Sequence, residues 1–171
     1  MEFNWSPQCE EAFVKLKNIL CEAPILAYPD FSQPFLLYTD ASGVGIGAVL
    51  AQIGPDDKEH VISYASRSLK KHERNYGITD LEILAIVWAM SYYRPYLLGT
   101  TTRIITDHQA SHWILQKKKP KMAVGQRHIR WALSLQEYDY TVEYKPGRIH
   151  KNADALSRPL IIHYPKNSDP D

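Results

Sequence analysis

Four acidic residues stand where a carboxylate could take part in chemistry. Asp40 and Asp107 end two similar runs, Leu-Tyr-Thr-Asp and Ile-Ile-Thr-Asp, each of which is typical of a β-strand. Glu82 lies within a helical run of Leu, Ile and Ala, and Asp154 lies in the sequence Asn-Ala-Asp-Ala-Leu-Ser-Arg. Because sites form at the carboxyl ends of strands in sheets covered by helices, Asp40 and Asp107 would face one another if their strands are adjacent and parallel.

Each of these acids also has a purely structural explanation. Asp40 could belong to a turn before Ala-Ser-Gly, and Asp107 could cap a helix that starts at the next residue. Thr79 and Glu82 have the spacing of a capping box. Asp154 could be an acid in the first turn of a short helix, where the helix dipole favours a negative charge. Against the capping box, an ionised Glu82 among apolar neighbours needs a partner or a metal ion.

As a group, the four acids suit hard divalent cations, which prefer carboxylate oxygen and retain waters for a phosphate substrate. Two such ions about 3.5 to 4 Å apart would activate a water and stabilise the leaving oxygen. The local sequence leaves both the joint explanation and the separate ones open.

The elements that must position these acids follow from hydrophobic periodicity and from the turn residues Pro and Gly. A first helix opens at Ser6-Pro7 and ends before Pro24, and an extended connector follows it. Glycines between residues 41 and 47 permit a close backbone approach or a bulge near Asp40. The order of elements predicts a mixed sheet with helices packed on it, its first three strands antiparallel. We expect strands at 35–39, 49–53, 61–64, 102–106 and 140–144, and further helices at 79–93, 108–116, 126–138 and 152–158.

The composition is that of an ordinary globular domain. With 171 residues, 44% hydrophobic and 23% charged, the chain is expected to fold as one domain, and disordered, collagenous and coiled-coil classes are disfavoured. The longest apolar run, 83–90, has eight residues, whereas a membrane-spanning helix needs about 20. The N-terminus has no signal-peptide pattern, so we expect no secretion and assign Cys9 and Cys21 to packing in a reducing compartment.

A basic block stands out against the net charge of +1. Residues 108–136 contain no Asp or Glu but six Lys or Arg residues, which leaves −5 for the rest of the chain. Such a block is either a solvated face or a phosphate-binding surface, and charge alone does not decide between them. Its basic residues are Lys117, Lys118, Lys119, Lys121, Arg127 and Arg130.

The four acids belong to longer motifs, and these motifs resemble the ribonuclease H domain of reverse transcriptases from gypsy-like LTR retrotransposons. The motifs occur in the family's order and cover nearly all of residues 35–158. Trp5 and the stretches 9–13 and 23–31 resemble the segment that joins the polymerase part to ribonuclease H. The matching motifs are Thr-Asp-Ala-Ser-Gly-Val-Gly-Ile-Gly-Ala-Val-Leu (39–50), Ser-Arg-Ser-Leu (66–69), Glu-Arg-Asn-Tyr (73–76), Leu-Glu-Ile-Leu-Ala-Ile-Val (81–87), Tyr-Leu-Leu-Gly (96–99), Thr-Asp-His (106–108) and Ala-Asp-Ala-Leu-Ser-Arg (153–158).

The resemblance implies an α/β architecture, the ribonuclease H-like fold, with a five-stranded mixed sheet flanked by helices. It divides the chain into a connector helix and linker (1–33), a ribonuclease H domain (34–160) and a C-terminal linker tail (161–171). The implied partners are an RNA–DNA hybrid and the polymerase part of the same polyprotein. The implied location is the cytoplasm, within retroelement particles.

The resemblance also implies a catalytic and metal-binding site made of four carboxylates, Asp40, Glu82, Asp107 and Asp154, which hold two Mg²⁺ ions, with Mn²⁺ as a substitute. The implied reaction is hydrolysis of the RNA strand of a hybrid by in-line attack of water, with 3'-hydroxyl and 5'-phosphate ends. The 2'-hydroxyl would separate RNA from DNA. The alternative is a catalytically silent module of the same fold that binds hybrid or a polymerase partner.

Substrate contacts are expected from residues near the acids and from the basic block. Relatives often have a histidine in the loop before the last acid, whereas Tyr144 stands ten residues before Asp154 in this chain and His150 lies closer. The candidate substrate-binding residues are Ser42, Gly43, Arg67, Arg74, Asn75, Lys117, Lys118, Lys119, Tyr144 and His150.

Overall fold

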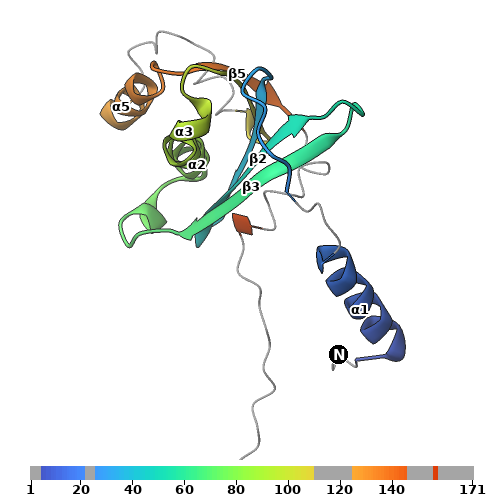
Figure 1. Cartoon of the computed structure of the whole chain (residues 1–171). Coiled ribbons are helices and arrows are strands. Elements are labelled where there is room, and N and C mark those ends of the chain that lie inside the picture. Colours follow the sequence, from blue (N-terminus) through green and yellow to red (C-terminus); the bar gives the residue numbers. More distant parts are fainter. Residues whose placement is uncertain (1–4, 22–25, 110–124, 146–155, 158–171) are drawn as a thin grey trace, which may run out of the picture.

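A computed structural model of the chain describes residues 5–21, 26–109, 125–145 and 156–157. Its centre is a five-stranded sheet in the order β3-β2-β1-β4-β5 (Figure 1). The first three strands pair antiparallel, and β1–β4 and β4–β5 pair parallel, so the expected mixed sheet is confirmed. The strands are β1 (Phe35–Ala41), β2 (Gly45–Ile53), β3 (Glu59–Ser68), β4 (Thr101–Thr106) and β5 (Asp139–Tyr144).

Helices cover one face of the sheet. Figure 1 shows α2, α3 and α5 on the same side, with α2 against the central strands, whereas α1 lies apart from the sheet. The helices are α1 (Pro7–Cys21), α2 (Ile78–Tyr92), α3 (Arg94–Leu97) and α5 (Gln126–Ser134), with a single 3-10 turn, η1 (Glu73–Asn75), before α2. Within the described parts of the chain, no helix is both long and hydrophobic enough to cross a bilayer.

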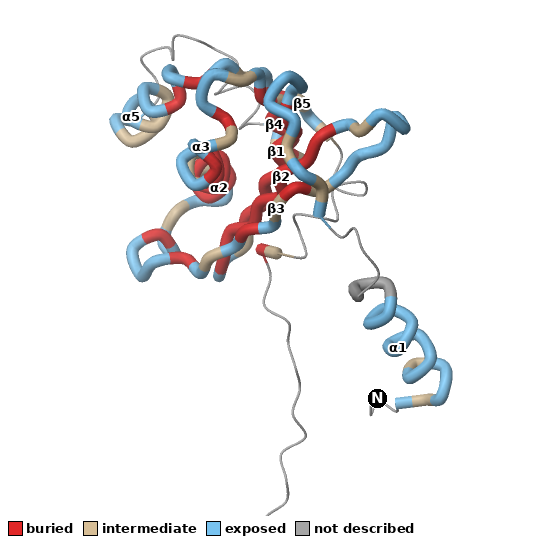
Figure 2. The backbone as a smooth tube through the Cα atoms, viewed as in Figure 1, coloured by how far each residue is buried: buried red, intermediate tan, exposed pale blue. Residues whose placement is uncertain are grey.

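The main core lies between α2 and the sheet, where Figure 2 shows the buried residues. Phe35 and Leu37 of β1 pack there with Ile83 and Ile86 of α2, while Trp131 of α5 packs from the outer side. A helix enclosed in this way is apolar all round, which explains why α2 shows no single hydrophobic stripe. The enclosed α2 gives its side chains fixed positions over β1.

The strands β1, β2 and β3 are longer than the sequence predicts. The expected strand at 49–53 starts at Gly45, because the chain reverses within residues 42–44 and the glycines at 45 and 47 lie inside β2. The ladder between β2 and β3 is irregular at Leu50 and Ala51 and not near Asp40. The helix expected at 126–138 ends at Ser134, and the helices expected at 108–116 and 152–158 lie largely outside the described residues.

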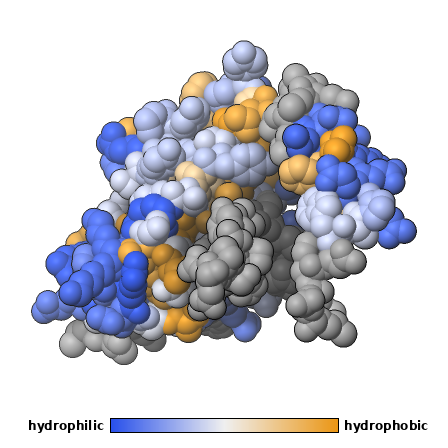
Figure 3. All heavy atoms as spheres, turned by 90° about the horizontal axis from the view of Figure 1, so that it is seen from below, coloured by the Kyte–Doolittle hydropathy of each residue, from blue (hydrophilic) through white to orange (hydrophobic). Residues whose placement is uncertain are grey.

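Helix α1 has the predicted start and length, but its hydrophobic residues lie in solvent. Phe13 and Val14 are about half exposed, and Leu16 is 60% exposed. Figure 3 shows that hydrophilic residues predominate on the face seen from below, with hydrophobic patches between them. The rest of the described chain therefore leaves these apolar side chains of α1 largely uncovered.

Candidate metal centre

Asp40 lies inside β1 and not in a turn. It pairs with Gly47 of β2 and is only 5% exposed, so the turn explanation for this residue is wrong. On its other side, β1 pairs parallel with β4, and Tyr38 faces Ile105. Asp107 follows the last residue of β4 and therefore stands as far beyond that pair as Asp40 does. The two acids thus end neighbouring parallel strands, as the sequence predicts.

Glu82 comes to the same place from α2, which packs over β1. The helix has Gly77 as its N-cap and begins at Ile78, without any hydrogen bond from a capping side chain. Thr79 is therefore already inside the helix, and the capping-box explanation for Glu82 is wrong. The side chain of Glu82 is 4% exposed, and its Oε2 atom has no hydrogen-bond partner among the described residues.

Three carboxylates converge at this point. One oxygen each from Asp40, Glu82 and Asp107 lies within 4.8 Å of the others. Burial, followed by the charges of Asp40 and Asp107, raises the pKa of Glu82 to about 8, although the Ala41 amide opposes this change. Ionisation of all three carboxylates at this largely buried place would require a compensating positive charge, and the partnerless Oε2 atom of Glu82 is available as a ligand. The oxygen-only donor set fits a hard divalent cation such as Mg²⁺ or Mn²⁺.

The fourth expected acid, Asp154, lies outside the described residues. Ser157, three residues later in the sequence, does contact the cluster. Ser157 is 2% exposed, and its hydroxyl donates a hydrogen bond to Oδ2 of Asp40. Ser157 is a functional residue that no sequence pattern singles out by itself. The available signal was its place in the Ala-Asp-Ala-Leu-Ser-Arg motif, three residues after Asp154.

Two candidate substrate residues, Ser42 and Gly43, form the reversal between β1 and β2. The Ser42 hydroxyl donates to the carbonyls of Gly45, at 3.2 Å, and of Ser157, so this side chain already has structural partners. Gly43 is exposed, and a Cβ atom built on it meets no other atom within 4 Å. The backbone at Gly43 is therefore open to a ligand beside Asp40.

Arg67 has a structural partner, Glu73, that its sequence pattern does not reveal. Its Nη1 and Nη2 atoms donate to the two carboxylate oxygens of Glu73 at 2.7 and 3.1 Å. Glu73 is 5% exposed and also accepts the Lys70 amide at 2.7 Å. Burial by itself would raise the pKa of Glu73, but the hydrogen bonds from Arg67 and Lys70 and the charge of Arg67 lower it below its ordinary value. The ion pair therefore ties η1, which lies between β3 and α2, to the end of β3.

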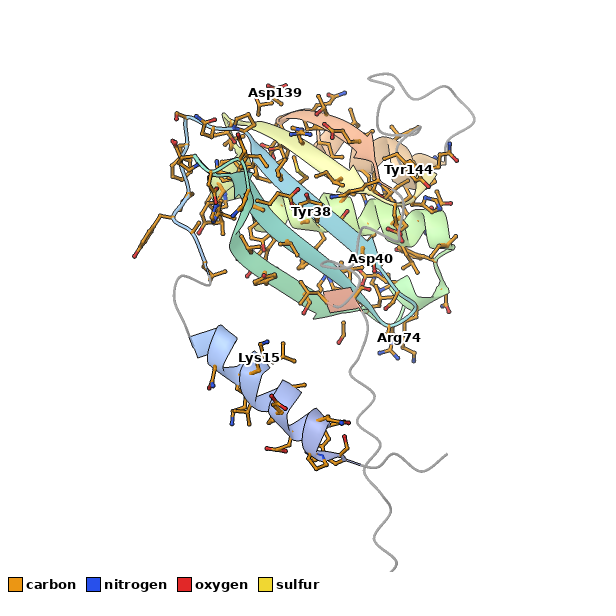
Figure 4. All side chains as sticks on the ribbon, turned by 90° about the vertical axis from the view of Figure 1, so that its right-hand side faces the viewer. Lys15, Tyr38, Asp40, Arg74, Asp139 and Tyr144 are labelled. Carbon is orange, nitrogen blue, oxygen red and sulfur yellow. The ribbon has the colours of Figure 1, made fainter. Side chains whose placement is uncertain are left out.

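The remaining candidates are divided between solvent and the undescribed segments. Arg74 and Asn75 are exposed on η1, and Tyr144 is half exposed at the end of β5. Figure 4 shows Arg74 and Tyr144 toward the same end of the sheet as Asp40, with Asp139 at the opposite end. Tyr144 pairs in register with Thr106, the residue before Asp107. The candidates Lys117, Lys118, Lys119 and His150 lie outside the described residues.

Part of the basic block is tied to α2. Nη1 of Arg127 and Nε2 of His128 lie 2.9 and 2.5 Å from the two carboxylate oxygens of Asp80. The Arg127 guanidinium also stacks over the Tyr76 ring, 3.8 Å from its centroid. Helix α5 is therefore anchored to the start of α2, close in sequence to Glu82, and the Arg127 guanidinium has Asp80 as its ion-pair partner.

Comparison with known proteins agrees with this geometry. Residues 5–104 match the family described as the RNase H-like domain found in reverse transcriptase. The retrovirus-related Pol polyprotein from transposon 297 of Drosophila melanogaster is 45% identical over 148 residues, which make up 86% of this chain and 13% of that polyprotein. The chain thus spans about an eighth of the length of this relative.

Two solved structures share the fold. The foamy viral protease-reverse transcriptase in complex with RNA/DNA hybrid matches with a TM-score of 0.57 and 16% identity, over 95% of this chain and 22% of that chain. The RNase H1 named LC11, isolated from compost by a metagenomic approach, matches with a TM-score of 0.57 and 15% identity, over 72% of this chain and 92% of that chain. The sheet order and the family match together confirm the expected fold and show that the chain belongs to the RNase H-like domains found in reverse transcriptases of retrotransposon Pol polyproteins.

Proposed function

We propose that this chain is a metal-dependent endonuclease that hydrolyses the RNA strand of RNA–DNA hybrids during reverse transcription, giving 3'-hydroxyl and 5'-phosphate ends. The observation that supports it most strongly is the convergence of Asp40, Glu82 and Asp107 from three separate elements. Among proteins of this fold, the foamy viral enzyme was solved with an RNA/DNA hybrid, which supports the choice of substrate.

The proposed ligands of two Mg²⁺ ions, or of Mn²⁺ in their place, are Asp40, Glu82 and Asp107, with Asp154 as the fourth. When bound, the cations would activate the attacking water and neutralise the charge that develops on the phosphate. Glu82 retains a proton at neutral pH in the metal-free protein, because its pKa is about 8, and it would have to lose this proton to serve as a ligand. The fixed positions of β1, β4 and α2 supply the preorganisation on which such catalysis depends.

The proposed hybrid contacts surround this cluster. The proposed contacts to the sugar-phosphate chain are the open backbone at Gly43 and the exposed side chains of Arg74 and Asn75. Arg67 is assigned a supporting role, because its guanidinium is committed to Glu73. The lysines at 117–119 remain proposed electrostatic contacts, and Tyr144 and His150 remain candidates near the last acid.

The domain boundaries are also part of the proposal. Residues 1–33 would connect ribonuclease H to the polymerase part of the polyprotein, and 161–171 would form a linker tail. The exposed apolar side chains of α1 suit contact with that polymerase part. The proposed place of action is the cytoplasm, inside retroelement particles.

The decisive experiment is cleavage of an end-labelled RNA strand annealed to DNA, with Mg²⁺ or Mn²⁺ and with EDTA. Matched RNA–RNA and DNA–DNA duplexes and the Asp40→Asn variant serve as controls. We expect metal-dependent cleavage of the hybrid alone and no cleavage by the variant. A folded protein that binds hybrid but never cuts it would contradict the proposal and favour the silent module.

A further inference from the structure

We propose that Ser157 is a positioning residue for the metal centre, which orients Asp40 and holds the C-terminal end of the domain beside the carboxylate cluster. This inference rests on the proposed function, because it concerns how the same site is prepared for its cation. Ser157 itself is not proposed as a ligand. Its hydroxyl acts on the cluster through Asp40.

The side chain of Ser157 makes the first contact. Its hydroxyl donates to Oδ2 of Asp40, and both residues are almost completely buried, at 2% and 5% exposure. Little water reaches this place, so a hydrogen bond to a carboxylate here is stronger than one at the surface. The bond fixes the rotation of the Asp40 carboxylate, and with it the direction in which that carboxylate presents its oxygens.

The backbone of Ser157 is held separately. Its carbonyl oxygen accepts the Ser42 hydroxyl from the reversal between β1 and β2. A Cβ atom on Gly45 would lie 3.1 Å from that carbonyl oxygen and 3.2 Å from the carbonyl oxygen of Arg67. Gly45 therefore leaves room for the Ser157 backbone to lie against the start of β2. The next residue back, Leu156, packs against the apolar cluster on the sheet face opposite α2.

These contacts form a latch, defined here as Ser157 with Asp40, Ser42 and Gly45. The described residues Leu156 and Ser157 are thereby held beside Asp40. Residues that hydrogen-bond metal ligands typically change metal affinity 10- to 100-fold when they are removed. The latch is therefore expected to matter for metal affinity more than for hybrid binding.

The test measures Mn²⁺ binding to the full chain by calorimetry, without any nucleic acid. We expect Ser157→Ala to weaken Mn²⁺ binding about tenfold. Gly45→Ala keeps every hydroxyl and carboxylate but crowds the docked backbone, so it should weaken binding in the same direction. The matched control is Ser134→Ala, which removes a serine hydrogen bond to a backbone carbonyl on α5, away from the cluster.

Two further readouts separate positioning from loss of fold. Thermal unfolding in EDTA identifies any variant that does not fold, and Gly45→Ala then stands as the second test of the latch. In the cleavage assay, Ser157→Ala should regain most of its kcat at high Mg²⁺ or Mn²⁺ concentration, with an unchanged KM for hybrid.

The possible outcomes are distinct. Parental Mn²⁺ affinity in folded Ser157→Ala and Gly45→Ala would overturn the latch while leaving the proposed function intact. Absence of Mn²⁺ and Mg²⁺ binding by the parental chain would overturn the proposed function, and the latch with it. Weakened binding by both latch variants, with an unchanged control, is the result that the latch predicts.

Discussion

Asp40 and Asp107 lie at matching positions on two neighbouring parallel strands. Tyr38 of β1 pairs with Ile105 of β4, and each acid comes two residues after its member of that pair. The parallel pairing of β1 with β4 thus brings together two acids that are distant in sequence. Glu82 reaches the same point because α2 packs on β1, and this convergence is the basis of the predictions below.

Asp107→Asn should weaken Mn²⁺ binding at least tenfold and abolish hybrid cleavage, because it removes a charged ligand. In EDTA the same variant should be as stable as the parental protein or slightly more stable, because it removes one of the charges that oppose ionisation of Glu82. Calorimetry and thermal unfolding check the two statements. Asp57→Asn is the control, since Asp57 lies in an exposed turn with a positive φ of 56° that Asn also tolerates. A variant at position 107 that binds Mn²⁺ like the parent would remove this acid from the site.

The metal-free protein should lose stability as the pH rises from about 5 to 9. The pKa of Glu82 in the folded state is about 8, above the ordinary 4.5, because of burial and the charges of Asp40 and Asp107. The folded state therefore holds a proton that the unfolded state releases, and its stability is fully present below pH 4.5 and is lost as the pH passes 8. The loss should be about 2 to 5 kcal/mol.

Thermal unfolding in EDTA between pH 5 and 9 measures this loss, with Glu82→Gln as the comparison. The Gln variant should show a much flatter profile, because it has no carboxyl to ionise. Addition of Mn²⁺ should reverse the loss in the parental protein and release protons. Identical profiles for the two proteins would show that Glu82 does not titrate as described.

Glu73→Gln should reduce the free energy of unfolding by about 2 to 3 kcal/mol, since it leaves Arg67 without its buried partner. The control Glu137→Gln breaks an exposed ion pair with Arg94 and should cost much less stability, because solvent screens that pair. Because the pKa of Glu73 is lowered, its contribution is present at neutral pH and is lost as the pH falls below its ordinary range. Urea unfolding at pH 7 and pH 3 measures both effects, and equal costs for the two variants would contradict the structural role of the pair.

Neutralisation of Lys117, Lys118 and Lys119 to Gln should weaken hybrid binding and flatten its dependence on salt by about three units of log–log slope. Binding of a non-cleavable DNA–DNA or hybrid duplex in EDTA, titrated over salt concentration, gives this slope. Neutralisation of Lys15 and Lys17 on α1, which lies apart from the sheet, is the comparison. An unchanged slope in the triple variant would identify residues 117–119 as a solvated face.

The amino-acid sequence by itself determined the family, the mixed sheet and the identity of three acids in the cluster. Asp40 and Asp107 end similar β-type runs, and Glu82 lies in a helix too apolar to be a surface helix, so local pattern was enough to select them. The length of α1 and the positions of β4 and β5 also followed from periodicity and turn residues. These features depend on residues that are only a few positions apart, so local sequence patterns are sufficient to predict them.

Only the tertiary structure decided between the alternatives for Asp40 and for Glu82, and only it identified the supporting residues. The turn at Asp40 and the capping box at Glu82 were locally sound, and they failed because strand pairing extends β1 and because α2 begins at Ile78. The role of Ser157 was not predicted because its partner Asp40 is remote in sequence, and the Arg67–Glu73 pair was missed because Arg67 was assigned to substrate. A close backbone approach was expected of the glycines at 41–47, but only the fold shows that Gly45 makes it and that Ser157 is the neighbour. Hydrogen bonds and close packing of this kind depend on distances that only the folded chain defines, so no local pattern records them.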